Sequence, residues 1–90
     1  MAKLSELYDA APLARKIFAN DLRIRIILCL NEKARFFDEI VNFVEAEKYD
    51  VRQELRELEK LEVVECIDEI YSLTRLLGKP TAHFLRKIEK

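Results

Sequence analysis

The sequence predicts a mainly α-helical domain with one small β-hairpin. The chain has only 90 residues, a length that provides one domain with a single modest core. Apolar residues recur every three or four positions through most of the chain, which is the period of a helix buried along one side. Between residues 63 and 73 the pattern changes to two short β-prone runs separated by two residues, as in a hairpin.

The first third of the chain is expected to form helices and a short strand. Residues 3–19 have apolar side chains at helical spacing, and a proline divides them. Asn20 or Asp21 can cap a second helix that runs to about Leu30. Apolar residues lie on more than one side of this helix, so we expect it to be buried. After a polar turn, residues 34–37 are extended enough for a small edge strand.

Two further helices are expected before the hairpin. The first begins at Asp38 and continues to about Val44, with its apolar residues on one side. The second runs from about Asp50 to Glu62. Asp50 and Gln53 have the spacing of a capping box, with aspartate in place of serine or threonine, which predicts that this helix begins there.

The end of the chain combines the hairpin with a last helix. The two β-prone runs are residues 63–67 and 70–73, and the Asp-Glu pair between them lacks the glycine that favours a primed turn. A Gly-Lys-Pro sequence then interrupts the returning helical pattern. Its Pro80 suits the first turn of a last helix that ends near Ile88.

This order of elements, at this length, is typical of a winged helix-turn-helix domain with extra N- and C-terminal helices. The motifs at residues 18–27, 39–55, 55–65 and 71–79 also resemble those of the ArsR-like and MarR-like winged helix regulators. Residues 18–27 are similar to the family's L-A-N-P-T-R-L-R-I-L, and residues 39–55 align without a gap on E-L-A-x-x-L-G-L-S-x-x-x-V-S-x-x-L. Residues 55–65 resemble H-L-x-x-L-x-x-x-G-L-V-E, and residues 71–79 resemble Y-x-L-T-x-x-G.

The chain departs from the family pattern in its turn and its wing. Glu45 stands where the family has a glycine, and Glu47 stands where it has a serine cap. The turn therefore lacks the residue best suited to a positive φ, so either the preceding helix extends further or the turn takes another shape. The wing loop is reduced to almost two residues. The cysteine cluster of many ArsR-type metal sensors is absent, so the resemblance implies no metal site.

The resemblance implies one winged helix domain over residues 1–90. In it, residues 1–19 form an N-terminal helical extension, residues 20–74 the winged helix core and residues 75–90 the C-terminal helix. The implied function is that of a DNA-binding transcriptional regulator that acts as a homodimer. Its recognition helix, at about residues 49–61, would enter the major groove of double-stranded DNA.

The candidate DNA-binding residues lie on this recognition helix. Val51, Leu55 and Leu58 mark its buried side. The opposite and flanking positions carry types that contact bases or phosphates, or that simply form a solvated face. These residues are Lys48, Tyr49, Arg52, Gln53, Arg56 and Lys60. Basic residues outside the motif that could supply phosphate contacts are Arg15, Lys16, Arg23, Arg25, Arg35 and Arg75.

The charge distribution works against strong DNA binding. The net charge of −1 divides into +3 for residues 1–35, −8 for residues 36–70 and +4 for residues 71–90. Affinity for DNA depends largely on neutralising phosphates, so acidic side chains in the motif oppose it. Glu57 lies close to the expected DNA face, and the acidic hairpin tip makes a poor DNA contact. A second hypothesis is therefore a winged helix protein–protein interaction module, whose acidic face binds a basic protein partner without binding DNA.

Apolar residues near both ends of the chain exceed what one small core needs, which favours a homodimer formed through the terminal helices. The alternative is that they only cap the core. These residues are Leu4, Leu7, Leu13, Ile17 and Phe18 at the N-terminus and Phe84, Leu85 and Ile88 at the C-terminus.

Composition argues against several other classes of protein. His83 is the one histidine and has no adjacent nucleophile, and a single glycine excludes phosphate-binding loops, so we expect neither an enzyme nor a cofactor. No run of 18 apolar residues occurs, which excludes a transmembrane helix or secretory signal and favours a cytoplasmic location. The many charged residues favour a thermophilic source. Cys29 and Cys66 are expected to be buried, reduced thiols, with a disulfide as the alternative in a hyperthermophile.

Overall fold

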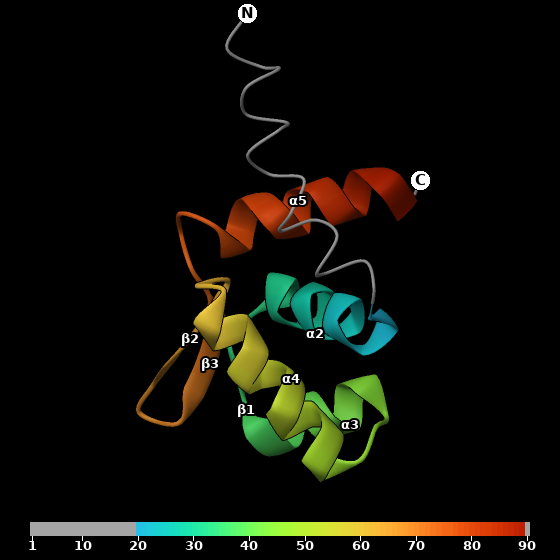
Figure 1. The fold of residues 1–90 in the computed structure, drawn as a ribbon, viewed down its shortest axis with the longest axis vertical. Helices are drawn as coiled ribbons and strands as arrows, with labels where there is room; N and C mark the ends of the chain where they lie inside the picture. Colours follow the sequence, from blue (N-terminus) through green and yellow to red (C-terminus); the bar gives the residue numbers. More distant parts are fainter. Residues whose placement is uncertain (1–19, 90) are drawn as a thin grey trace, which may run out of the picture.

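The computed structural model describes residues 20–89, which form four helices and a small three-stranded sheet (Figure 1). The expected helical segment at residues 3–19 lies outside the described residues. The elements are α2 (Asp21–Glu32), β1 (Arg35–Phe36), α3 (Phe37–Val44), α4 (Lys48–Lys60), β2 (Val64–Ile67), β3 (Ile70–Leu73) and α5 (Gly78–Glu89). The prediction of a mainly α-helical fold with a small β-hairpin is confirmed.

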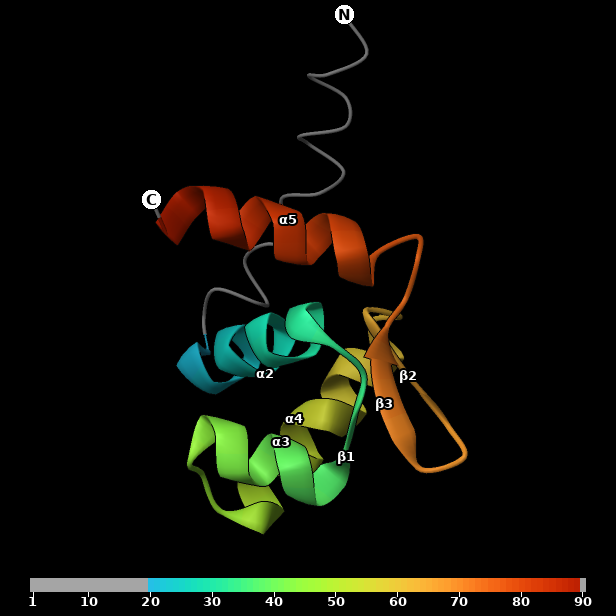
Figure 2. The ribbon, with the colours of Figure 1, turned by 180° about the vertical axis from the view of Figure 1, so that it is seen from behind.

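Helix α2 is the centre of the core. It contacts α3, α4, α5 and β3, and in Figures 1 and 2 it lies between α5 and the α3–α4 pair. The side chains of Ile26, Ile27 and Cys29 are fully buried, which explains why apolar residues occupy more than one side of this helix. The Asn20 side chain caps the helix by accepting a hydrogen bond from the Arg23 N–H.

Helix α3 begins at Phe37, one residue earlier than expected, and ends at Val44. Glu39 supports its first turn, because its Oε1 accepts a hydrogen bond of 2.9 Å from the Phe36 N–H. At the other end, Glu45 has a φ of 53° and its N–H donates to the Val41 carbonyl. The turn therefore keeps the left-handed conformation usual at a helix C-terminus, although a glutamate occupies the position instead of glycine.

Helix α4 begins at Lys48, two residues before the expected start. The capping box predicted for Asp50 and Gln53 was wrong, because both residues lie inside the helix and Gln53 instead bonds to Tyr49. Asp50 lies in the first turn, where a negative charge interacts favourably with the helix dipole.

The C-terminal end of α4 leads directly into β2 through a Schellman turn. Glu62 has a φ of 61° and its N–H donates to the Glu59 carbonyl, while the Val63 N–H donates to the Leu58 carbonyl. The Val63 side chain is fully buried after this turn. The turn therefore reverses the direction of the chain within two residues, so that β2 begins beside β3 in the sheet.

The antiparallel sheet has the strand order β1-β3-β2. Val64 pairs with Leu73, and both side chains are buried, so this side of the hairpin faces the core. The loop residues Asp68 and Glu69 have φ values of 53° and 69°, as in a type I′ turn. The tight hairpin predicted from the sequence is confirmed, with two acidic residues in conformations that usually require glycine or asparagine.

Helix α5 begins at Gly78 after a turn at residues 75–77, and the Gly-Lys-Pro sequence forms its first turn, which confirms the prediction that Pro80 lies there. The Thr74 hydroxyl accepts a hydrogen bond from the Gly78 N–H at 2.8 Å. A Cβ on Gly78 would lie 2.2 Å from the Val63 carbonyl oxygen, so glycine is required here by close packing against the backbone.

The inner side of α5 closes the core over α2. Ala82 and Leu85 are buried, so Leu85 belongs to the core and not to a free dimerisation surface as predicted. Phe84 is 45% exposed, and the side chain of Ile88 lies outside the described part. Within residues 20–89, no helix combines the length and apolar character needed to cross a bilayer.

Candidate nucleic-acid interface

Helix α4 presents one buried and one exposed side. Val51, Leu55 and Leu58 are completely buried against the core, as their spacing predicted. The candidate residues are all exposed on the remaining surface of α4: Lys48, Tyr49, Arg52, Gln53, Arg56 and Lys60. The structure therefore brings all six onto one helix as a continuous polar surface.

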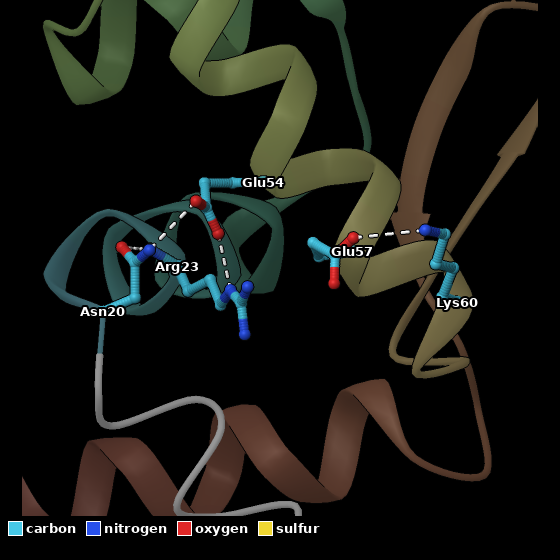
Figure 3. A network of polar contacts seen from close by, with 5 residues as sticks. All are labelled: Asn20, Arg23, Glu54, Glu57 and Lys60. Atoms are coloured by element: carbon cyan, nitrogen blue, oxygen red, sulfur yellow. Dashed lines mark hydrogen bonds and ion pairs between the residues drawn. The ribbon is translucent and has the colours of Figure 1, made fainter.

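A polar network fixes α4 to the beginning of α2. Glu54 lies on α4 and points toward α2, where its Oε1 is 2.5 Å from Arg23 Nε and its Oε2 accepts a hydrogen bond of 2.9 Å from Asn20 Nδ2 (Figure 3). The side chains of Arg23 and Glu54 are only 16% and 17% exposed, which reduces screening by water. The network therefore sets the position of α4 relative to the core.

Contacts with other side chains order most of the exposed α4 surface. Gln53 Nε2 donates a hydrogen bond of 2.8 Å to Tyr49 Oη. The Arg52 guanidinium lies 4.3 Å from the centre of the Phe37 ring on α3, a cation–π contact that directs it along the α3–α4 junction. These contacts hold three of the candidate side chains in defined positions before any partner binds.

The lysines at the two ends of the surface form exposed ion pairs. Lys48 Nζ is 4.0 Å from Asp38 on α3, and Lys60 Nζ is 3.3 Å from Glu57 one turn earlier in α4. Exposed pairs of this kind contribute little to stability and exchange readily with other partners. Arg56 lies between them and has no hydrogen bond or ion pair with a residue in the range 20–89.

Comparison with solved structures places this arrangement among known folds. Quinone-bound YodB from B. subtilis superposes with a TM-score of 0.79 at 24% identity, over 87% of this chain and 89% of that chain. Reduced HlyU from Vibrio cholerae gives 0.78 at 20% identity, over 98% and 97%. A MarR family transcriptional regulator from Silicibacter pomeroyi gives 0.73 at 16% identity, over 97% and 68%. No protein-family model and no curated protein matches the sequence.

The chain has the winged helix-turn-helix fold. Helices α3 and α4 with the turn at Glu45 form the helix-turn-helix, and strands β2 and β3 form the wing. The resemblance to MarR-like winged helix regulators, inferred from short motifs, is confirmed at the level of the fold.

The helix-turn-helix motif carries fewer free acidic side chains than its sequence indicates. Glu54 is neutralised by Arg23 inside the interface between α2 and α4. Glu57, which we expected to repel phosphate, is paired with Lys60. The wing differs, because residues 61–74 contain four acidic side chains and no basic one. Residues 37–60 and residues 61–74 therefore each carry a net charge of −4, but only the wing lacks basic side chains.

Several basic residues proposed for phosphate contacts have structural roles instead. Arg23 is paired with Glu54, and Arg25 Nη1 donates to the Val44 carbonyl at 2.8 Å, which ties α2 to the end of α3. Arg35 contacts Glu32, the Cys29 carbonyl and the Phe43 ring. Arg75 is exposed. Arg15 and Lys16 lie outside the described residues.

The two thiols differ in their surroundings. Cys29 is buried in α2, and burial raises its pKa to about 11. Cys66 is exposed on β2, which corrects the prediction that both thiols are buried, and the two thiols are not joined in a disulfide. Cys66 faces Tyr71 on β3, where burial, followed by the charge of Cys66, raises the pKa of the phenol.

Two further features bear on catalytic or metal chemistry. His83 is exposed on α5. Within residues 20–89, no group of three or more His, Cys, Asp or Glu side chains is arranged to hold a metal ion.

Proposed function

We propose that this chain is a DNA-binding transcriptional regulator of the cytoplasm whose helix α4 enters the major groove as a recognition helix. The observation that carries the proposal is the exposed polar surface of α4, held in position by the Glu54 network at its back. Recognition helices of this fold dock on DNA in this way, with their buried side against the core. The likeness to the YodB, HlyU and MarR family structures supports the same reading.

The side chains on α4 suggest a division of roles. Arg56, near the middle of the surface, is suited to a bidentate contact with guanine, and the Tyr49–Gln53 pair presents an amide suited to adenine. Lys48 and Lys60 would exchange their exposed carboxylate partners for phosphates. Arg52, stacked on Phe37, would reach a phosphate beside the α3–α4 junction.

The local charge implies modest affinity. Each pair with a carboxylate must open before its lysine neutralises a phosphate, and the acidic wing repels the backbone on either side of the groove. We therefore expect binding that depends on a few α4 contacts, with an affinity that falls with salt at the shallow slope set by that small number of phosphate contacts.

A homodimer would combine two such weak contacts on one duplex. In the proposed assembly the terminal helices pair, with the exposed Phe84 side chain of α5 at the contact. The two α4 helices would then lie about 34 Å apart, the spacing of successive major grooves on one side of the duplex.

A binding assay with matched variants tests the proposal. Fluorescence anisotropy with labelled random duplex, repeated over a range of salt concentrations, should give an affinity that falls as salt rises. Arg56→Ala should weaken binding to this random duplex roughly tenfold, because it removes a positive charge from the exposed surface of α4 that faces the groove in the proposed complex. Lys33→Ala removes one positive charge from the exposed turn after α2 and should change the affinity little.

Two results would count against DNA recognition by α4. Equal losses for Arg56→Ala and Lys33→Ala would mean that only total charge matters. The absence of any complex at low salt would remove the support for DNA binding and favour the second hypothesis, a protein–protein interaction module with an acidic face.

A further inference from the structure

An apolar row crosses the outer face of the sheet near the tip of the wing. In the antiparallel register, Phe36 of β1 pairs with Ile70 of β3, and Ile70 pairs with Ile67 of β2. Directly paired residues project to the same face of a sheet, so these three side chains lie side by side. The buried pair Val64 and Leu73, three positions further along the hairpin, projects to the opposite face, toward the core.

The row is exposed to an unusual degree for large apolar side chains. Phe36 is 51% exposed and Ile67 is 62% exposed, while Ile70 between them is half-buried. No element within residues 20–89 covers this face: in Figure 2 the helices lie on the other side of the sheet or beyond its edge. An exposed apolar cluster surrounded by polar groups is typical of an interaction surface.

The surroundings of the row are acidic at both ends. Glu65 lies on the same outer face of β2, and Asp68 and Glu69 form the turn beside Ile67. At the other end, the Glu39 carboxylate lies against the Phe36 backbone N–H. The wing itself, residues 61–74, contains no basic residue. A partner that covers the apolar row must therefore approach a field of negative charge.

We propose that this outer wing surface, formed by Phe36, Ile67 and Ile70 with their acidic surroundings, docks a basic protein segment that also carries apolar side chains. The apolar groups of the partner would cover the row, and its lysine or arginine side chains would pair with Glu65, Asp68 and Glu69. Both parts of this chemistry are needed, because charge complementarity steers and orients a partner while buried apolar area holds it.

The same features disfavour other occupants of the surface. DNA would meet carboxylates in place of the lysines and arginines that bind phosphate. A second copy of the chain, docked through the same face, would place two acidic tips against each other. A basic protein segment satisfies both the apolar and the electrostatic character.

The docking surface and the α4 surface lie on different sides of the wing. Tyr71 projects to the inner face, where the charges of Glu59 and Arg52 on α4 act on it. The outer face is turned away from α4, so a protein partner and DNA would not compete for the same side chains. Binding of a protein partner at the outer wing can therefore be tested independently of DNA binding by α4.

Titration of the isotope-labelled protein with short synthetic peptides, followed by NMR, tests the proposal. In the first peptide lysine alternates with isoleucine, in the second lysine alternates with serine, and in the third glutamate alternates with isoleucine. The first should bind best and shift the amide resonances of Phe36, Ile67 and Ile70. Ile67→Ser and Glu65→Gln should each weaken this peptide roughly tenfold.

Two matched control variants distinguish binding at this surface from non-specific binding of the peptide. Leu76→Ser removes an apolar side chain that is 86% exposed outside the sheet, and Asp21→Asn removes an exposed carboxylate at the far end of α2. Both should leave peptide binding and its shifts unchanged. The spectra also show directly whether each variant is folded.

Five results would overturn the proposal, and the first four concern the peptides and the oligomeric state. These are no shift with any peptide, equal binding of the two lysine peptides, shifts that do not centre on the outer wing, and a change of oligomeric state in Ile67→Ser, which would assign the row to a second copy. A loss of DNA affinity in Ile67→Ser would likewise assign it to DNA. Retention of normal DNA affinity in that variant, together with loss of the peptide, supports docking.

Discussion

Glu54 shows how a single side chain changes the meaning of the local charge. It lies in α4, the proposed recognition helix, where an exposed carboxylate would repel phosphate, but it points back toward α2 and binds Arg23 and Asn20 (Figure 3). Asn20 in turn caps α2. Asn20 and Arg23, which belong to the first family-like motif, therefore hold α4 in place through Glu54.

We predict that Glu54→Ala destabilises the fold by about 1–3 kcal/mol, because it takes away the carboxylate that a mostly buried arginine and amide share. Glu57→Ala is the matched control on the same helix. Its pair with Lys60 is largely exposed, so the loss should be below about 0.5 kcal/mol. Urea unfolding of both variants measures the difference, and equal losses would show that the network does not hold α4.

The two cysteines lead to a prediction about reactivity. The thiolate is the reactive form, and burial raises the pKa of Cys29 to about 11 while removing it from solvent. At pH 8 a thiol reagent should modify one equivalent per chain quickly, at Cys66, and the second only after unfolding. Cys66→Ser should abolish the fast phase. Two fast equivalents in the native protein would show that α2 opens readily.

At the scale of elements, acidic residues occupy every position with a positive φ in the described part of the chain. The described residues with positive φ are Glu45, Glu62, Asp68 and Glu69, which end α3, end α4 and form the tip of the wing. Glycine would be preferred at such positions by up to about 1 kcal/mol each. The single glycine is used instead at residue 78, where a side chain would collide with the backbone. Helices α3 and α4 and the hairpin therefore end where the fold requires, but the acidic residues at these positions lower the stability of the protein.

The turn at the tip of the wing can test how much stability is lost when acidic residues adopt a positive φ. Asp68→Asn with Glu69→Gly introduces the preferred residues of a type I′ turn and removes two neighbouring negative charges. We expect the double variant to be more stable by about 1 kcal/mol, seen as a higher midpoint in thermal unfolding. Glu59→Gly, in the interior of α4, should lower the midpoint. A lower midpoint for the wing variant as well would mean that the acidic turn makes contacts that stabilise it.

At the scale of the whole molecule, helix α5 bears on how two chains would pair in the proposed dimer. Leu85, which belonged to the predicted dimer surface, is needed for the core, whereas Phe84 on the same helix remains exposed. Helix α5 thus packs one side against the core through Leu85, while Phe84 lies on its exposed side.

We predict that light scattering finds twice the mass of a single chain and that Phe84→Asp gives the single-chain mass. The charge would be buried at the proposed contact, which is unfavourable. Phe36→Asp, at a similarly exposed phenylalanine on the sheet, should remain a dimer. A single-chain mass for the unaltered protein at high concentration, or dissociation by both variants, would contradict pairing through α5.

The local pattern along the chain determined the elements and their order. Helical spacing predicted the buried side of α4 through Val51, Leu55 and Leu58, and the two β-prone runs predicted the hairpin. The start of α4 was misplaced because Asp50 and Gln53 have capping-box spacing, a local signal that also occurs inside a helix. The first turn of α5 was predicted from Pro80, because the fixed φ of proline suits that position, and the Thr74 hydroxyl accepts a hydrogen bond from this turn.

The site required the tertiary structure. The sequence identified the six exposed residues of α4, since their positions follow from one helix and its buried side. It did not show that Glu54 faces Arg23, that Arg52 rests on Phe37, or that Phe36 continues the apolar row of the wing. Each of these contacts joins residues far apart in the chain, and their distances depend on how the helices and strands pack. The sequence alone determined the charge of each segment, and only the packing decided which charges meet a partner.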